Sequence, residues 1–219
     1  MILRKRATRS WRAALVAVPL ALVASACLPA PRAWVGDGPR VLVFGDSLTH
    51  RLERGADNDP RKRLLTNDLV AGGYAASVSS MTGAKTLDLA AVVPTIPDPG
   101  PDILLISLGS NDMRVKDGAT LTPLATAIDN VRAAMTQVAA KCTVLVTVAE
   151  TAPWGLDTDA PAFNQALRAL PNVVIADWAP LVAANPLFVT EDGVHHTDLG
   201  VGAYRDLYRN AIGSCARAL

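Results

Sequence analysis

Five short apolar runs, separated by segments with helical spacing, constrain the fold of this chain more than any other feature. The third run holds four consecutive aliphatic residues at 103–106, which is typical of a strand covered on both faces. Strands that alternate with helices predict a parallel, doubly wound sheet with helices on both faces. The runs lie at Arg40–Phe44, Tyr74–Ser79, Asp102–Leu108, Thr143–Val148 and Val173–Ala176.

The segments between the runs carry apolar residues at spacings of three and four, the pattern of an amphipathic helix. We expect Pro161 in the first turn of its helix, where a missing amide hydrogen is tolerated. Half of the 219 residues are hydrophobic but only 5% are aromatic, so the core of this single domain must be mainly aliphatic. The predicted helices span Leu64–Ala71, Thr86–Val93, Leu121–Ala140, Pro161–Leu170 and Leu199–Ala211.

The first 26 residues have the pattern of an export signal. Five cations lie within residues 4–12, and a mostly apolar stretch covers residues 13–26 and ends in Ala-Ser-Ala. This stretch is shorter than the roughly 20 apolar residues that a spanning helix needs, and its small residues form a cleavage pattern. We therefore expect residues 1–26 to be a signal peptide and the mature protein to be exported, either secreted or held at the cell surface.

Cys27 directly follows this stretch, and the residues from Val23 to Cys27 resemble a bacterial lipobox. The resemblance implies a lipid on Cys27; the alternative is ordinary cleavage beside an incidental cysteine. Residues 27–39 are rich in proline and glycine, which indicates a tether without a core of its own. The globular domain is expected to cover residues 40–219.

The net charge restricts the classes of binding partner that the sequence allows, and the cysteine content bears on disulfide formation. Removing residues 1–26 takes away five cations and no acid, which leaves 16 basic residues against 20 acidic ones. Without a basic field we expect no nucleic-acid partner, and membrane contact only through the lipid at Cys27. Cys142 and Cys215 remain; outside the cytoplasm a disulfide between them is expected, although two buried thiols would fit the sequence as well.

Ser47 lies in Gly45-Asp46-Ser47-Leu48, directly after the first apolar run. A serine hydroxyl becomes an effective nucleophile only when a nearby base removes its proton. A tight turn at Gly45 would expose the hydroxyl at the carboxyl edge of the sheet, where the sites of such folds lie. Taken alone, the segment favours a plain loop in which Asp46 or Ser47 caps a helix. The functional interpretation therefore needs a base elsewhere in the chain.

His195 supplies a candidate base near the end of the chain. Asp192 precedes it by three residues, close enough for the carboxylate to accept the Nδ1 hydrogen and fix the tautomer. The alternative is a surface Asp-Gly turn with an incidental histidine. His196 is a rival base, but the spacing favours His195, and we expect His196 to flank the site at the pocket rim. His50 has no carboxylate at comparable spacing.

Gly109-Ser110-Asn111-Asp112 follows the third run. The Asn111 amide can donate a hydrogen bond to an oxyanion, although Asn and Asp are also common in plain turns. The backbone amide of Gly83 could contribute a second donor. Trp154, in the loop after the fourth run, is a candidate for the pocket wall, whereas Trp178 is expected in the core.

These blocks resemble the SGNH hydrolases of the GDSL esterase/lipase superfamily. Gly45 to Leu48 matches the serine block, Gly109 to Asp112 the Gly-x-Asn-Asp block, and Asp192 to His195 the Asp-x-x-His block; Gly83 is the match to the loosest block. The resemblance covers roughly Arg40 to the C-terminus. It implies a flavodoxin-like three-layer α/β/α fold with a five-stranded parallel sheet in the order 2-1-3-4-5.

The resemblance also implies roles for individual residues. Ser47, Asp192 and His195 would form a catalytic triad. The Ser47 and Gly83 amides and the Asn111 side chain would form the oxyanion hole. Asp46, Gly109 and Asp112 would be structural, and neither a metal nor an organic cofactor is expected.

Three functions use or reuse this arrangement. The first is hydrolysis of a carboxylic ester, either a short-chain acyl ester or an acetylated glycan, through an acyl-enzyme. The second is acyl transfer to or from cell-wall or other glycans, because three pieces of the sequence are similar to bacterial O-acetyltransferase domains: Thr151 to Trp154, Asn164, and Val174 to Trp178. The third is a non-catalytic surface binding module. A metal hydrolase using His195, His196, Asp192 and Asp198 would leave the serine and asparagine blocks unexplained. The oligomeric state is open.

Overall fold

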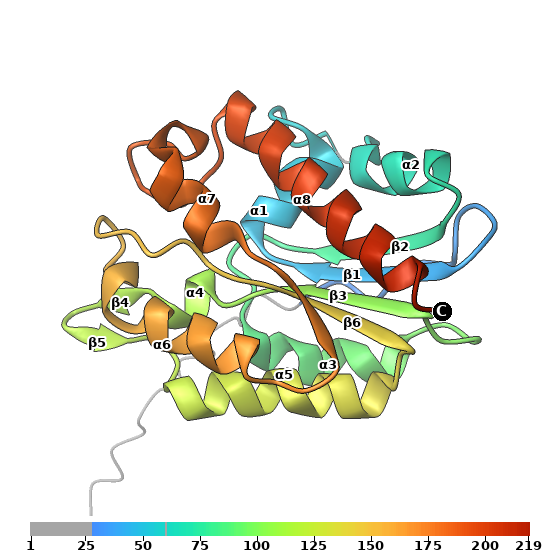
Figure 1. Cartoon of the computed structure of the whole chain (residues 1–219), viewed down its shortest axis with the longest axis horizontal. Coiled ribbons are helices and arrows are strands. Elements are labelled where there is room, and N and C mark those ends of the chain that lie inside the picture. The colour runs from blue at the N-terminus through green and yellow to red at the C-terminus, as the bar shows by residue number, and fades with distance from the viewer. Residues whose placement is uncertain (1–27, 60) are drawn as a thin grey trace, which may run out of the picture.

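The computed structural model describes residues 28–59 and 61–219. Its centre is a sheet of five parallel strands in the order β2-β1-β3-β6-β7 (Figure 1). This confirms the predicted α/β fold and strand order. The expected signal peptide and lipid site at Cys27 lie outside the described residues. The strands are β1 (Arg40–Gly45), β2 (Ala75–Ser80), β3 (Ile103–Ser107), β6 (Cys142–Val146) and β7 (Val173–Ala176).

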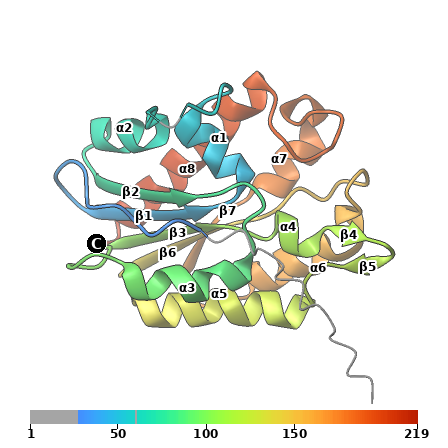
Figure 2. The ribbon, with the colours of Figure 1, turned by 180° about the vertical axis from the view of Figure 1, so that it is seen from behind.

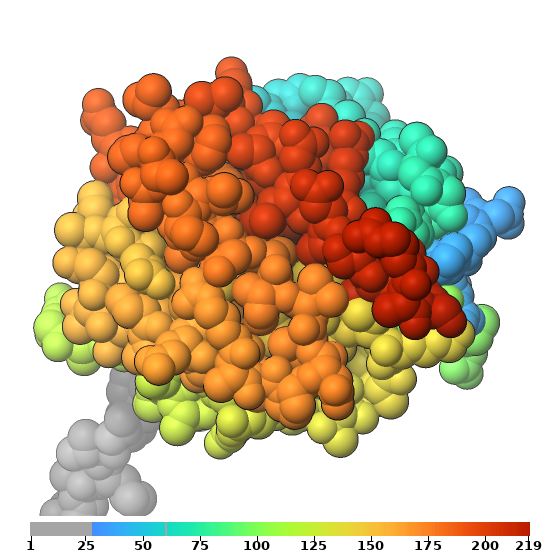
Figure 3. Space-filling model, viewed as in Figure 1, coloured from blue at the N-terminus to red at the C-terminus, as the bar shows by residue number. Residues whose placement is uncertain are grey.

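Helices cover both faces of the sheet, as Figures 1 and 2 show. Figure 3 shows α8, in red, on the surface between the orange α7 region and the cyan to green residues of α1 and α2. One layer contains α1 (Ser47–Arg54), α2 (Leu64–Ala71), α7 (Trp178–Ala184) and α8 (Asp198–Ala216). The other contains α3 (Leu89–Val92), α5 (Leu124–Val138) and α6 (Leu156–Arg168). Short elements complete the fold: η1 (Thr86–Asp88), η2 (Val93–Thr95), α4 (Ser110–Met113), β4 (Val115–Lys116), β5 (Ala119–Thr120) and η3 (Pro186–Phe188).

Helix α6 begins at Leu156, well before the predicted start at Pro161, so this proline lies inside the helix and the expectation was wrong. Two features start the helix early. Gly155 turns the chain with a φ of 68°, and the acidic side chains of Asp157 and Asp159 lie in the first turn, where they favour the positive end of the helix. Proline at 161 removes one helical hydrogen bond, to the carbonyl of Asp157.

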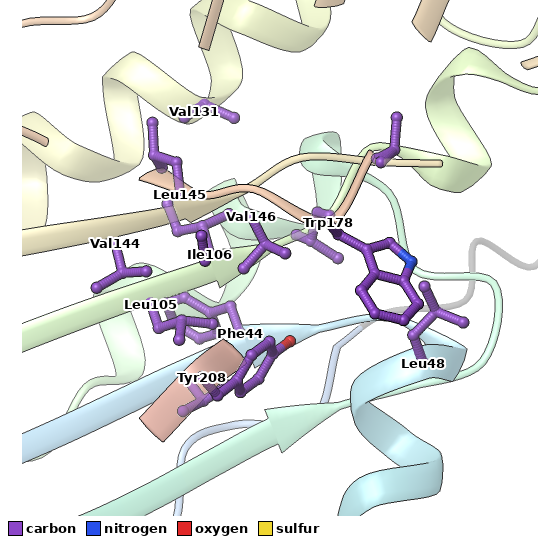
Figure 4. Close-up of a cluster of buried hydrophobic side chains, with 14 of the residues drawn as sticks. Phe44, Leu48, Leu105, Ile106, Val131, Val144, Leu145, Val146, Trp178 and Tyr208 are labelled. Atoms are coloured by element: carbon purple, nitrogen blue, oxygen red, sulfur yellow. The ribbon is translucent and has the colours of Figure 1, made fainter. Parts of the chain in front are cut away.

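Aliphatic side chains fill the core on both sides of the sheet. Figure 4 shows Leu105 and Ile106 of β3 near Val144 and Leu145 of β6, and all four are at most 2% exposed. Tyr208 of α8 lies in the same cluster. Because the central strands are covered on both faces, they form a rigid support for the loops at their carboxyl ends.

The residues before β1 pack along β2, which corrects the expected start of the globular part near Arg40. Val35 forms an antiparallel bridge with Ala76, and the carbonyls of Arg32 and Pro29 accept hydrogen bonds from Ser77 and Ser79. At the far end of this segment, Leu28 is only 3% exposed and belongs to the hydrophobic core. We call residues 28–35 the N-terminal strap. The prediction of a tether was wrong because a proline-rich composition indicates a stiff local chain but does not indicate whether that chain packs against the rest of the protein.

Cys142 and Cys215 are joined by a disulfide, with their Cα atoms 5.6 Å apart. It ties the beginning of β6 to the last turn of α8, a separation of 73 residues. Both attachment points lie at the amino edge of the sheet, because β6 starts there and α8 runs back toward it from the carboxyl edge. The link therefore supports the fold at the end opposite to the loops that follow the strands.

Replacing both cysteines by alanine should lower the free energy of unfolding by about 4 kcal/mol, because the unfolded chain regains the freedom of a long loop. Urea denaturation followed by circular dichroism measures the change. Hydrolysis of p-nitrophenyl acetate, the activity expected from the serine and histidine blocks, should stay within twofold in the folded variant, since the bridge lies far from the loops at the carboxyl edge. An unchanged denaturation midpoint for the double variant would contradict a stabilising role of the Cys142–Cys215 bridge.

Candidate active site

Three strand ends bring the candidate residues together. Gly45 at the end of β1 pairs with Ser80 of β2 on one side and with Ser107 of β3 on the other. The segments that leave these three strands therefore start side by side at the carboxyl edge of the sheet. Ser47 is the second residue after β1, and Asn111 follows β3 in α4.

Ser47 is the first residue of α1, and the preceding Asp46 caps that helix by accepting the amide hydrogen of Leu48 at 3.0 Å. The first amide of a helix has no partner within the helix, so the Ser47 N–H is available for an anion. Gly45 has an ordinary φ, so its role differs from the expected freedom of turning. A Cβ there would lie 2.0 Å from Oγ1 of Thr49, so glycine permits close packing of α1 on β1.

Asp46 and Asp112 are buried carboxyls that hold the loops in place. Burial raises the pKa of Asp46 to about 7, against the hydrogen bond from the Leu48 amide. Burial likewise raises the pKa of Asp112, which accepts hydrogen bonds from the amide and hydroxyl of Thr86 at 2.9 and 2.7 Å. Asp112 thus joins the segment after β3 to the segment after β2. Both carboxyls therefore hold groups of the loops that surround the candidate site.

His195 and Asp192 lie on one tight loop before α8. The Asp192 Oδ1 atom accepts the backbone amides of Val194 and His195, both at 2.9 Å, and Oδ2 accepts the Nδ1 hydrogen of His195 at 2.5 Å. Gly193, with a φ of 75°, makes the turn between them. The Nε2 atom of His195 lies 3.1 Å from Oγ of Ser47. An unbroken line of hydrogen bonds therefore runs from a carboxylate through an imidazole to a hydroxyl.

Asp192 is held in its ionised form. Partial burial by itself would raise the pKa of this carboxyl, but hydrogen bonds from the His195 ring, from the Val194 and His195 amides and from the Thr190 hydroxyl bring the pKa well below its usual range. A carboxylate that stays charged can stabilise an imidazolium next to it.

Asn111 and the segment of Gly83 are joined through the residue after Gly83. The Asn111 side chain is 9% exposed, and its Nδ2 donates one hydrogen to the carbonyl of Ala84 at 3.0 Å. An amide carries two hydrogens, so the second can reach another acceptor. Gly83 has a φ of 83°, and Gly109 has a φ of 131° with no room for a Cβ, because Phe163 would lie 2.5 Å away. Glycine at 109 is thus required by both conformation and packing.

If Asn111 donates to the oxyanion, Asn111→Ala should lower kcat for p-nitrophenyl acetate by about two to three powers of ten, with a much smaller change in KM. Steady-state kinetics over a range of substrate concentrations separates the two parameters. Asn130→Ala is a matched control, because that amide donates to Thr86 and does not face Ser47. A loss confined to KM would contradict the oxyanion role.

The GDSL-like lipase/acylhydrolase family profile matches residues 43–203, which include the serine, asparagine and histidine blocks. The chain belongs to this family. Membership confirms the resemblance drawn from the blocks and identifies the chain as a carboxylic ester hydrolase of the SGNH type. No protein of curated function matches the chain in sequence.

Solved structures share the fold of this GDSL-family chain at low sequence identity. A lipase/acylhydrolase from Enterococcus faecalis is 19% identical with a TM-score of 0.62, over 80% of this chain and 95% of that one. The acetyl xylan esterase AlAXEase is 21% identical with a TM-score of 0.61, over 79% and 99%. The psychrotrophic esterase EstA from Pseudoalteromonas sp. is 18% identical with a TM-score of 0.58, over 81% and 98%. At these identities the likeness supports the fold.

Trp154 flanks the imidazole of this GDSL-family site. Its ring meets His195 edge-on, with the ring centroids 5.4 Å apart, and the guanidinium of Arg114 lies 4.3 Å from the indole centroid. The Trp154 carbonyl also accepts the amide of Val115, just after α4. Trp154 therefore links the segment that carries Asn111 to the loop that carries His195.

His196 does not flank the pocket, which corrects the prediction. It is fully buried, packed against Trp178 and Tyr204 with ring centroids 5.2 and 4.3 Å away. Neither ring nitrogen has a hydrogen-bond partner among the described residues. Burial, with smaller contributions from the charges of Arg51 and His195, lowers the pKa of His196 to about 3. Adjacent residues on an extended segment point to opposite sides, so His195 at the site places His196 in the core.

This buried histidine predicts a pH-dependent stability. Its pKa in the folded state lies below the unfolded value of about 6.5, so only the unfolded chain binds the proton between those values. The contribution of the neutral His196 ring to the free energy of unfolding is fully present above about pH 6.5. As the pH falls below that value, this contribution decreases by up to about 1.4 kcal/mol per pH unit. His196→Phe keeps an aromatic ring without the charge, so its unfolding free energy should fall less than the wild type between pH 6 and 4. If urea denaturation showed that the unfolding free energies of the wild type and of His196→Phe fall equally between pH 6 and 4, the proposed role of His196 would be refuted.

Two cavities lie near the His195 loop. A small one of about 230 Å³ holds the candidate nucleophile and base, and a larger one of about 540 Å³ lies on the other side of the loop, against α7. Of the residues in the candidate hydrogen-bonded line, Ser47 and His195 thus open onto the smaller cavity, and Asp192 lies outside its lining. Its lining is Ser47, His50, Arg51, Gly55, Ala56, Asn58, Thr82 and His195.

The charged segment 50–63, which follows the candidate nucleophile in the sequence, is predicted to form part of the pocket wall, and its residues His50, Arg51, Gly55, Ala56 and Asn58 line the cavity. Thr82 was not singled out as a cavity residue. His50 lies one helical turn after Ser47 and shares its face of α1. The His50 ring is fixed by Ser80 through Nδ1 at 3.2 Å and by Asn58 through Nε2 at 2.8 Å. Its ring therefore forms a fixed wall of the cavity.

Proposed function

We propose that this chain hydrolyses short-chain carboxylic esters through an acyl-enzyme on Ser47, with His195 as the base and Asp192 as its orienting carboxylate. The observation that carries the proposal is the pair of contacts at His195. Nε2 lies 3.1 Å from the Ser47 hydroxyl, and Nδ1 lies 2.5 Å from an ionised carboxylate. A hydroxyl so placed can lose its proton to the imidazole as it attacks a carbonyl.

The reaction then proceeds in two steps, formation of the acyl-enzyme and its hydrolysis. In the first, Ser47 Oγ bonds to the ester carbonyl carbon while its proton moves to Nε2 of His195, and the Ser47, Gly83 and Asn111 donors receive the oxyanion. Collapse breaks the bond to the alcohol, which leaves with the proton from Nε2. In the second step, water adds to the acyl-enzyme through the same base and releases the acid.

The size of the cavity supports a short acyl group. At about 230 Å³ it is below the range of drug-sized ligand pockets, and Thr82 and the fixed ring of His50 bound it beside the serine. An acetyl group suits such a space, and the shared fold with an acetyl xylan esterase supports acetate as the first acyl group to test.

Fluorophosphonate labelling tests the proposal directly. We expect one covalent adduct on Ser47, located by mass spectrometry of the tryptic peptides, and loss of the adduct when the protein is unfolded before labelling. In parallel, hydrolysis of p-nitrophenyl acetate, butyrate, octanoate and palmitate should fall as the chain lengthens. An adduct on another serine, or no labelling of the folded protein, would overturn the assignment.

A further inference from the structure

The N-terminal strap delivers the beginning of the described chain to the carboxyl edge of the sheet. Its direction is fixed by its contacts with β2. Val35 bridges Ala76, and toward the N-terminus the Pro29 carbonyl bonds Ser79, which is next to the last residue of that strand. Figure 2 shows the blue strap running back beside β1 and β2 toward the end of the sheet where α1 and α4 lie.

Leu28 therefore lies close to the candidate nucleophile. Ser80, at the end of β2, pairs with Gly45, and Ser47 is two residues further on. Neighbouring strands lie about 5 Å apart and each extended residue advances about 3.3 Å, so Leu28 and Ser47 are about 15 Å apart. The side chain of Leu28 is buried, which holds this end of the strap in place.

The sequence before the strap is the most apolar of the chain. Residues 13–26 carry the apolar stretch of the export signal, and Cys27 directly precedes Leu28. Whether attachment is by a lipid on Cys27 or by the stretch itself, it joins the folded protein at residue 28. None of the helices in residues 28–59 and 61–219 combines the length and apolarity that crossing a bilayer requires.

The same edge presents exposed leucines. Leu187 and Leu199, which flank the His195 loop, are 71% and 56% exposed. They are neighbours, because Thr197 bonds the carbonyl of Leu187. Leu87 in the segment after β2 and Leu121 after the β4–β5 hairpin are also exposed, at 43% and 39%. Single exposed leucines are common on protein surfaces, but Leu187 and Leu199 lie together beside the loop that carries His195, and this pair is the feature that suits contact with an apolar phase.

We propose that the carboxyl edge of the sheet faces the bilayer surface to which the exported chain is attached, so that Ser47 acts on esters presented at that surface. Residues 28–35, which were expected to be a free tether, pack along β2, so no free chain separates the folded domain from an attachment point at residue 27. The leucines at 87, 121, 187 and 199 contact the lipid interface. The proposal rests on the ester hydrolysis proposed above and adds a substrate class, carboxylic esters of membrane-embedded alcohols.

The test compares two acetate esters that differ in the anchoring of the alcohol. The full chain, produced with its own export segment, is purified from the membrane fraction and reconstituted in neutral phosphatidylcholine vesicles. Hexadecyl acetate in the bilayer and p-nitrophenyl acetate in solution are then supplied separately, and acetate release is measured. Since both substrates transfer the same acyl group, their ratio reports the presentation of the alcohol.

Two variants separate orientation from chemistry. A 20-residue Gly/Ser spacer between Cys27 and Leu28 adds about 25 Å of flexible chain, and Leu187→Asp with Leu199→Asp makes the edge polar. Each should lower the rate on hexadecyl acetate at least fivefold and leave that on p-nitrophenyl acetate within twofold. Leu219→Asp is the matched control, because this leucine is 47% exposed at the opposite edge, and it should change neither rate.

A measurement without substrate reports orientation directly. Bimane attached at Lys116→Cys, on the hairpin at the carboxyl edge, should be quenched by doxyl-labelled phosphatidylcholine, whereas bimane at Ala218→Cys should not. Equal quenching, equal rates for the spacer variant, or recovery of the chain from the soluble fraction alone would overturn the proposal. Site-selective quenching without any hydrolysis of p-nitrophenyl acetate would support the orientation and refute only the proposed ester hydrolysis.

Discussion

Replacing Ser47 by alanine should lower kcat for p-nitrophenyl acetate by about five to six powers of ten, to the residual rate that binding and oxyanion donors alone provide. The reason is that the base at His195 then has no hydroxyl to activate, although its contact with Asp192 remains. Because Ser47 starts α1 and is capped by Asp46 through Leu48, the substitution leaves the helix and its cap intact.

The measurement is initial-rate kinetics on protein whose folding is checked by circular dichroism and by its denaturation midpoint. Ser214→Ala is a matched control, since this serine lies in α8 and bonds the carbonyl of Asn210, far from the site. It should retain full activity. Turnover by Ser47→Ala within tenfold of the wild type would show that another group carries the reaction.

The sheet could be predicted because its central strands are aliphatic on both faces. Leu104 and Leu105 are both buried although they point to opposite faces, so a continuous apolar run was the correct signal. Helix ends were less predictable. The helix expected from Leu121 begins at Leu124, because Pro123 fixes the preceding residue in an extended conformation. Spacing gives the face of a helix, whereas single residues set its ends.

The β4–β5 hairpin and α7 are among the elements that were missed, in each case for a local reason. The hairpin of β4 and β5 turns at Asp117-Gly118, with φ values of 53° and 80°, a pair of residues that signals a tight hairpin. Its strands have two residues each, too short for an alternating pattern to be recognised. Helix α7 has only seven residues and contains Pro180, so its sequence is too short and too irregular for a helical pattern to be recognised.

The candidate site was predictable as three separate blocks but not as a geometry. Spacing could suggest that Asp192 orients His195, because they share one turn of the chain. The spacing of residues in the sequence cannot show that the Ser47 hydroxyl lies 3.1 Å from the ring of a histidine 148 residues away. That contact depends on where α8 begins, and the buried ring of His196 against Tyr204 fixes the start of that helix. The core thus positions the base, which explains why a residue expected at the rim lies beneath it.

Asp192→Asn should lower kcat by about four powers of ten while leaving KM close to the wild-type value. An amide in place of the carboxylate removes the charge that stabilises the His195 imidazolium, and it can present an N–H to Nδ1, which would favour the wrong tautomer. The Oδ1 atom of the asparagine can still accept the amides of Val194 and His195, so the loop should keep its shape.

The shape of the pH profile distinguishes this role from a merely structural one. Hydrogen bonds hold the pKa of Asp192 well below its usual range, so this carboxylate stays charged throughout the pH range in which esterases are measured. The wild-type rate on p-nitrophenyl acetate should therefore show no acid limb from Asp192. Asp198→Asn is the matched control, because its carboxylate is 97% exposed and forms a surface ion pair with Arg51, and it should retain activity within threefold. If Asp192→Asn lost activity only by unfolding, its denaturation midpoint would fall with its rate; we expect the midpoint to fall little, because Thr190, Val194 and His195 keep a hydrogen-bonding partner at position 192.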